Sequence, residues 1–118
     1  MNGENNFKQR IIQESVPGRQ ITLAHIIANP DKSLFEILGF EPAEGGAIGV
    51  MTICPAETSI IMADIAIKAS GVRVGFADMQ SGSLFITGSV SEVEAATLAI
   101  LDYLSEKLGF SVCPISNT

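Results

Sequence analysis

The fold of this chain is decided by residues 47–89, AIGVMTICPAETSIIMADIAIKASGVRVGFADMQSGSLFITGS, where every boundary carries its own signal. The uncharged run Ala47 to Ile53 predicts a strand, and Pro55 predicts the start of a helix that Gly71 ends. Over residues 72–77 apolar side chains alternate with small or charged ones, which predicts a half-buried strand. A polar turn at residues 78–83 then leads into a strand at residues 84–87, so this part indicates a hairpin.

The predicted helix between Pro55 and Gly71 is apolar on almost every side. After its first turn the only charged side chains are Asp64 and Lys68, which stand one turn apart and can form an ion pair. A helix of this composition is expected to be buried on more than one side.

A second helix follows the hairpin downstream. Ser91 and Glu94 have the spacing of a capping box, and Gly109 supplies the end. Five apolar residues form one stripe along it: Val93, Ile100, Leu101, Leu104 and Leu108. With a last β-like run at residues 110–115, the order from residue 47 is β-α-β-β-α-β. This order predicts an α+β sandwich of the ferredoxin-like, split β-α-β kind, with helices on one face of a mainly antiparallel sheet.

Upstream of residue 47 the sequence predicts two additional strands followed by a helix. Residues 1–9 are polar and are expected to form a disordered leader, before a β-like run at residues 10–16 and a turn at Pro17-Gly18. Residues 20–28 predict a strand that places Ile21, Leu23, His25 and Ile27 on one face and Thr22, Ala24, Ile26 and Ala28 on the other. Asn29-Pro30 is expected to cap a short helix that Gly39 ends.

The composition favours a protein that associates with itself. Hydrophobic residues make up 47% of the 118 residues and charged residues 17%, which is apolar for one small domain. We expect exposed apolar surface that symmetric assembly covers; an unusually dry core is the alternative. A net charge of −6 with scattered Lys and Arg argues against a nucleic-acid partner. The longest uncharged run, residues 45–56, is too short to span a membrane, and residues 1–7 do not resemble a signal peptide, so we expect a cytoplasmic protein without a membrane partner.

No catalytic or metal-binding constellation emerges, so we expect no catalytic residue, no metal and no cofactor. His25 is the only histidine and has no cysteine or second imidazole near it in the pattern, which favours a structural role. Cys54 and Cys113 are expected to be small buried hydrophobes; a reactive Cys54 thiol at a helix start is the alternative. The glycines of residues 45–49 precede a strand, which favours a flexible turn over a phosphate-binding loop.

Three segments carry a family resemblance: QESVPGRQITLAHIIANP (residues 13–30), GAIGVMTICPAETSIIMADIAIKASGVRVGFADMQSGSLFITGSVSEVEAA (46–96) and CPISNT (113–118). They resemble the circularly permuted BMC shell proteins of bacterial microcompartments, over nearly the whole chain from Arg10. The resemblance implies a permuted BMC domain over residues 19–118 that acts as a non-enzymatic, hexameric tile in a shell around metabolic enzymes. Propanediol, ethanolamine and choline compartments all use such tiles. The partners implied are further copies of the chain, other shell proteins and encapsulated enzymes.

The resemblance also implies roles for particular residues. A turn formed by Asp78, Met79, Gln80, Ser81 and Gly82 would line a central pore for small metabolites. In segment 10–18, residues Arg10, Ile11, Ile12, Gln13, Glu14, Ser15 and Val16 would form a six-chain axial barrel, which is expected to plug the pore; an open pore is the alternative. Lys68 would meet its counterpart between two hexamers, unless it is a solvated lysine paired with Asp64. Gly45 and Gly46 would be a hinge that bends the ring. Relatives differ at residues 44–46 and 79–80, so ring flatness and pore lining stay open.

Two other classes of protein compete with the shell interpretation. The runner-up is a small-molecule sensor on the same fold, with its ligand at a subunit interface, and an enzyme ranks third. A shell protein is expected to give hexamers, sheets, tubes or filaments without any ligand. A sensor would give a discrete dimer whose melting temperature rises with a metabolite.

Overall fold

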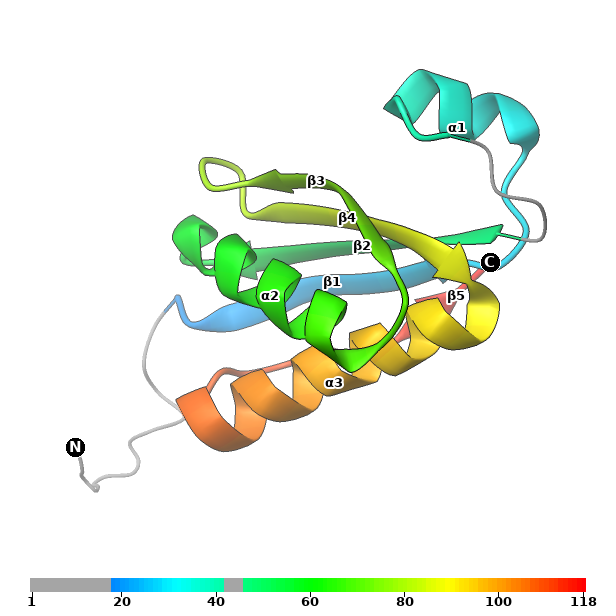
Figure 1. The fold of residues 1–118 in the computed structure, drawn as a ribbon. Helices are drawn as coiled ribbons and strands as arrows, with labels where there is room; N and C mark the ends of the chain where they lie inside the picture. Colours follow the sequence, from blue (N-terminus) through cyan, green and yellow to red (C-terminus); the bar gives the residue numbers. More distant parts are fainter. Residues whose placement is uncertain (1–17, 42–45) are drawn as a thin grey trace, which may run out of the picture.

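A computed structural model describes residues 18–41 and 46–118 of the chain (Figure 1). The elements in chain order are β1 (Gln20–Ile27), α1 (Lys32–Leu38), β2 (Gly46–Cys54), the 3₁₀ turn η2 (Ala56–Thr58), α2 (Ser59–Ala69), β3 (Arg73–Asp78), β4 (Ser83–Ser89), α3 (Val90–Leu108) and β5 (Ser116–Asn117). The predicted leader, residues 1–9, and nearly all of segment 10–18 lie outside the described residues.

The described strands form one sheet in the order β3-β4-β2-β1-β5. Neighbouring strands are antiparallel except β1 and β5, which run parallel. Helices α2 and α3 pack on one face of this sheet (Figure 1). The predicted α+β sandwich with a mainly antiparallel sheet is therefore confirmed. Strand β1 comes first in the chain yet lies between β2 and the last strand, which is the arrangement expected of a circular permutation.

The main hydrophobic core lies between the sheet and the two helices α2 and α3. The fully buried side chains include Met51, Met62, Leu84, Ile100 and Leu104, which come from β2, α2, β4 and α3. The predicted apolar stripe of α3 faces this core, with its last residue, Leu108, packed at the margin. Each such side chain contributes about 1.5–3 kcal/mol by leaving water, so this layer dominates the stability of the domain.

Helix α1 lies on the opposite side of the sheet from α2 and α3 (Figure 1). Phe35 of α1 and Phe40 after it bury Ile48, whose side chain leaves β2 on the face away from the main core. A Cβ atom on Gly75 would overlap the ring of Phe40, so glycine at this position lets the ring lie directly on β3. Helix α1 therefore covers only one end of the outer sheet face.

The caps of helix α1 differ in part from the prediction. Asp31, not Asn29, caps the helix, because its carboxylate accepts hydrogen bonds from the backbone N–H and the hydroxyl of Ser33 at 2.9 and 2.7 Å. Pro30 consequently lies outside the helix. Gly39 ends it in the left-handed region with φ of 79°, as predicted.

The capping box of α3 is real but lies two residues earlier than predicted. Ser89 and Glu92 form it: the Ser89 hydroxyl accepts from the Glu92 N–H at 3.1 Å, and the Glu92 carboxylate accepts from the Ser89 N–H at 2.9 Å. Ser91 and Glu94 do not form the capping box, because β4 passes directly into the helix at residue 90. Gly109 ends α3 as predicted, with φ of 71°.

Two further boundaries differ from the prediction. The helix expected from Pro55 starts with the 3₁₀ turn η2, and α2 proper begins at Ser59. The β-like run at residues 110–115 forms only a bridge from Ser111 to Gln20, and strand β5 comes after it. A strand ladder depends on a partner strand in space, and the last turns of a helix fray or become 3₁₀, so end positions are the least determined by local sequence.

Two β-bulges overturn the predicted alternation of faces. In β1 the register shifts between Ile21 and Leu23, so Ile21 points to the core together with Ala24. In β3 it shifts between Val74 and Phe76, and the Phe76 side chain leaves the core and is 46% exposed. One additional residue in a strand moves every later side chain to the other face.

Candidate assembly surfaces

The turn between β3 and β4 is organised by the side chain of Asp78. Its Oδ1 accepts a hydrogen bond from the Gln80 N–H at 2.9 Å, and its Oδ2 accepts one from the Ser81 hydroxyl at 2.8 Å. Gly82 closes the turn with φ of 77°, and its N–H donates to the Asp78 carbonyl at 2.8 Å. The five predicted pore-lining residues thus form one ordered turn, in which Met79, Gln80 and Ser81 are exposed.

The same hydrogen bonds set the charge state of Asp78. The N–H of Gln80 and then the hydroxyl of Ser81 hold the pKa of this carboxyl below its usual range. Because the pKa is lower in the folded state than in the unfolded state, the ionised carboxylate stabilises the turn above the unfolded-state pKa. That contribution is lost as the pH falls through the folded-state pKa.

This turn lies at the end of the sheet where β1 begins and β2 ends (Figure 1). Gln20, the first residue of β1, pairs with Cys54, the last residue of β2. The N–H of Ile53 donates to the Gly82 carbonyl at 2.9 Å. The first residue of β1 therefore lies at the same end of the sheet as the predicted pore-lining turn. The barrel residues, 10–16, lie outside the described residues, so the barrel stays a prediction.

Helix α2 starts beside the turn and carries Lys68 to the other end of the sheet. The hydroxyl of Ser59, its first residue, donates to the Asp78 carbonyl at 3.2 Å. Lys68 stands nine residues further along the helix, or about 14 Å from this start at 1.5 Å per residue. The position of Lys68 is thus peripheral with respect to the turn, as the predicted edge role requires.

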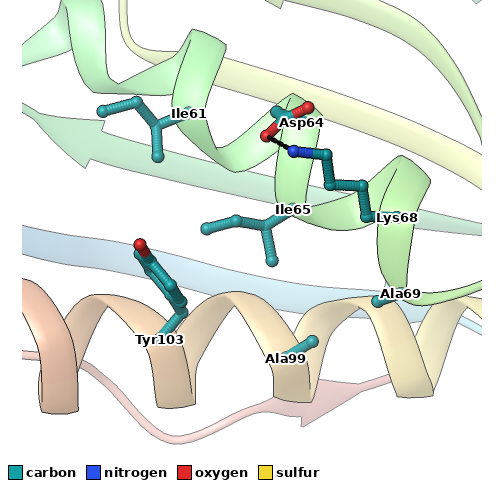
Figure 2. Close-up of a pocket in the computed structure, with 7 residues that line it drawn as sticks. All are labelled: Ile61, Asp64, Ile65, Lys68, Ala69, Ala99 and Tyr103. Atoms are coloured by element: carbon teal, nitrogen blue, oxygen red, sulfur yellow. Dashed lines mark ion pairs between the residues drawn. The ribbon is translucent and has the colours of Figure 1, made fainter.

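Lys68 borders a groove between α2 and α3 (Figure 2). Its Nζ lies 2.9 Å from Oδ2 of Asp64, which confirms the predicted ion pair. The Asp64 carboxylate raises the pKa of Lys68, so the ammonium stays charged. The groove has a volume of about 350 Å³ and is lined by Ile61, Asp64, Ile65, Lys68, Ala69, Ala99 and Tyr103. The edge role of Lys68 itself stays a prediction.

Helix α2 also presents an apolar surface that no described residue of the chain covers. Ile60 and Ile67 lie two turns apart on the side opposite the buried Met62 and Ala66, and they are 48% and 56% exposed. We call these two isoleucines the outer α2 patch. The expectation that α2 is buried on more than one side is wrong for the single chain, since only one side faces the core.

A second apolar surface lies on the sheet face away from α2 and α3. His25, Val50, Phe85 and Phe76 stand in one row across β1, β2, β4 and β3. The rings of Phe76 and Phe85 are 5.6 Å apart between centroids, and Leu23 is exposed nearby on β1. We call Leu23, Val50, Phe76 and Phe85 the open sheet patch. The α1 cluster covers part of this patch, since Val50 and Phe85 pack against Phe35, Phe40 and Ile48. Leu23 and Phe76 are its exposed members.

The candidate chemical residues take structural or solvent-facing positions. His25 Nδ1 lies 2.6 Å from the Ser116 hydroxyl and Nε2 lies 2.9 Å from the Thr118 hydroxyl, so the ring links the C-terminal residues to β1. Cys54 is exposed, which corrects the expectation of a buried thiol, because its side chain lies at the end of β2. Cys113 is half-buried against the core.

Metal clusters and membrane spans are absent from the described parts of the chain. Among residues 18–41 and 46–118, no group of three or more His, Cys, Asp or Glu side chains could hold a metal ion. No helix among those residues combines the length and apolar character needed to cross a membrane.

The predicted hinge is only half described. Gly46 is the first residue of β2, where it is buried and pairs with Ser89. Gly45 lies outside the described residues. The bending of a ring at this point therefore stays a prediction.

Sequence reasoning missed the open sheet patch and the groove. It placed Phe76 inside, although Gly75 in the middle of a strand is a signal for a bulge. One wall of the groove was indicated by the spacing of Ile61 and Ile65, which lie one turn apart on a different side of α2 from Met62. Its second wall, from Ala99 to Tyr103, comes from a helix distant in sequence, and no local pattern could have paired the two.

Comparison with known proteins identifies close relatives. The family model described as "BMC domain" matches residues 47–116. The bacterial microcompartment shell protein PduU of Salmonella typhimurium is 50% identical over 109 residues, which cover 92% of this chain and 93% of PduU. The shell protein EutS of the same organism is 47% identical over 111 residues, covering 94% and 98%. The solved structure "CutR flat hexamer, form 1" superposes with a TM-score of 0.82 at 46% identity, covering 93% of this chain and 100% of that chain.

Proposed function

Since the chain belongs to the BMC domain family of bacterial microcompartment shell proteins, we propose that it forms the hexameric tile of such a shell. The predicted family and the structural shell role are confirmed by these relatives. What is proposed for this chain is the hexamer and the way its surfaces form it.

The proposal of a hexameric ring rests on one observation, the pair of apolar patches on opposite layers of the molecule. A ring with more than two subunits needs heterologous contacts, in which one surface of each subunit meets a different surface of the next. The outer α2 patch lies on the helix layer and the open sheet patch on the other side of the sheet. Packing one on the other around a closed ring would remove both patches from water.

The ring would place the turn at residues 78–82 around its axis and Lys68 at its rim. Support comes from α2, which begins beside the turn and ends one residue after Lys68. Gln80 and Ser81 would offer neutral hydrogen-bonding groups to small polar metabolites. Inward-facing Ile12 and Val16 of six chains would fill a barrel above this opening and plug it. Flatness of the ring would depend on the glycines at residues 45–46.

The proposal includes a non-catalytic role in the cytoplasm. The support is the shell-protein relatives, together with the two patches, which suit assembly rather than a reaction. Other shell proteins and encapsulated enzymes would be the remaining partners. No nucleic acid is expected, since the net charge of −6 would repel a phosphate backbone.

Reversing the charge of Lys68 is expected to stop sheet formation without breaking hexamers. In Lys68→Asp, two acidic groups per chain would face each other between neighbouring tiles, whereas the ring contacts lie elsewhere. Native mass should show hexamers, and electron microscopy should show no sheets, tubes or filaments. Lys107→Asp is the matched control, because Lys107 is also an exposed lysine in the last turn of a helix but lies at the axial end. Unchanged sheets in Lys68→Asp would remove the edge role.

Deleting residues 1–15 is expected to open the axial opening while hexamers persist. The barrel would add little to ring contacts because a strand this short contributes little stability by itself. Access can be measured as the rate of thiol labelling of Gln80→Cys in a Cys54→Ser background, compared between full-length and shortened hexamers. Faster labelling after deletion supports the plug. Loss of hexamers, or equal labelling rates, would contradict it.

A further inference from the structure

We propose that residues 116–118 form a strap that covers the outer edge of β1, and that His25 is the latch that holds this strap in place. The strap consists of the two residues of β5 and Thr118. While it is in place, the edge of β1 cannot pair with β1 of a second copy of the chain. The inference does not depend on the proposed hexamer, because every contact that supports it lies within one chain.

The backbone of the strap is held by few hydrogen bonds. The Thr118 N–H donates to the Ile26 carbonyl, and the Thr118 carbonyl accepts from the Ala28 N–H, each at 2.9 Å. Strand β5 has only two residues, and residues 112–115, which lead to it, belong to no strand. All three strap residues are exposed, so burial of apolar surface adds little. A pairing this short is marginal by itself and needs a further contact.

The side chain of His25 supplies that contact. The half-buried ring projects from β1, where its Nδ1 lies 2.6 Å from Oγ of Ser116 and its Nε2 lies 2.9 Å from Oγ1 of Thr118. Ser116 and Thr118 are two residues apart, so an extended backbone presents both hydroxyls on one side. In a neutral imidazole one nitrogen donates and the other accepts, and a hydroxyl can do either, so both hydrogen bonds can form at once. One ring therefore ties both ends of the strap to β1.

The edge under the strap belongs to a strand that can pair readily with its own copy. Along one edge β1 pairs with β2 at seven positions, and along the other the described residues provide only β5 and the bridge from Ser111 to Gln20. The sequence of β1, QITLAHII, contains no Asp, Glu, Lys, Arg, Pro or Gly. Segments of this kind, rich in β-branched residues and free of charge, pair with copies of themselves when an edge is open. A second copy of β1 is therefore the expected occupant of the edge once the strap leaves it.

Hydrogen exchange of the full-length protein tests the latch. His25→Phe keeps a ring and removes both nitrogens, so we expect the amides of Ala28 and Thr118 to exchange about tenfold faster or more. Thr22→Val is the matched control and should leave these rates unchanged, because it removes a 2.6 Å contact of β1 with the Thr52 hydroxyl that does not involve the strap. Thr118→Val removes one latch bond at an exposed position, so it should give a smaller increase and remains informative if His25→Phe does not fold.

A distant amide separates release of the strap from a general loss of stability. The Ile53 N–H donates to the Gly82 carbonyl at the other end of the sheet and should keep its wild-type exchange rate in all variants. Wild-type rates at Ala28 and Thr118 in both His25→Phe and Thr118→Val would overturn the latch. An increase at Ile53 as large as that at Thr118 would overturn it too, since His25 would then stabilise the whole domain.

Deleting residues 116–118 tests the covered edge. At concentrations where the wild type forms no sheets, sedimentation velocity should show species larger than those of the wild type, and their share should grow with protein concentration. Thr22→Lys in the shortened chain should suppress these species, because like charges on two paired β1 strands repel each other. An unchanged size distribution after the deletion would overturn the role of the strap, whatever the exchange rates show.

Discussion

Ile67→Glu is expected to turn the hexamer into a folded monomer. Ile67 is 56% exposed in the single chain and forms the outer α2 patch with Ile60. In the proposed ring this patch packs on the open sheet patch of the next subunit. A carboxylate there would be removed from water without a partner, at a cost of about 2 kcal/mol or more at every contact of the ring. The helix itself should tolerate the change, because glutamate is a good helix former and the position is not part of the core.

The expected monomer can be distinguished from an unfolded chain by circular dichroism and from a hexamer by native mass. Ile37→Glu is the matched control, since Ile37 is an isoleucine on helix α1 that is 77% exposed and belongs to neither patch. Phe76→Glu should have the same effect as Ile67→Glu from the other side of the contact. A mixture of the two variants retains one intact contact and should form heterodimers but no rings. A contact that pairs a patch with itself would not give this result.

Gly82→Ala is expected to be the most destabilising single substitution in the predicted pore-lining turn. Gly82 has φ of 77°, a region that side chains with a Cβ atom disfavour, and its Cβ would overlap the Ile53 carbonyl oxygen. The obstacle is backbone that is itself hydrogen-bonded to Gly82, so it cannot move aside as a flexible side chain could. We expect a loss of about 3 kcal/mol in the free energy of unfolding, which lowers the melting temperature by roughly 10 °C.

The measurement is best made in the Ile67→Glu monomer, because melting of an oligomer depends on its concentration. Gly109→Ala is the matched control: Gly109 also has a positive φ, 71°, but its Cβ would meet no atom within 4 Å. It should cost only about 1 kcal/mol, which is the backbone strain alone. Equal losses at the two glycines would show that the close approach to Ile53 has no energetic importance.

Helix α2 shows why the sequence could predict the fold yet not the surfaces. Its all-round apolar composition led to the expectation of more than one buried side, but one chain buries only Met62 and Ala66 with their neighbours. In the proposed assembly the other sides have separate uses: Ile60 and Ile67 for the ring, and Lys68 for the rim. A pattern on one helix reports that a side chain is apolar, and it does not report which subunit covers it.

The elements that followed from the sequence were those with local causes. Gly39 and Gly109 end their helices where predicted, because a left-handed residue is a backbone requirement that glycine meets. The prediction of the orientation of Phe76 failed because the bulge in β3 is fixed by pairing with β4, which is a neighbour in space. The groove between α2 and α3 could not be predicted for the same reason, because its two walls are neighbours only in space. Roles assigned by resemblance to residues 10–16 depend on six chains meeting at an axis, which no single chain contains.

Native mass spectrometry of the purified full-length protein decides whether the chain forms the proposed hexamer. Each chain has a mass of 12.4 kDa. We expect a dominant species of six chains in the absence of any added ligand, and no such species for Ile67→Glu. A discrete wild-type dimer whose melting temperature rises with an added metabolite would contradict it and favour a sensor.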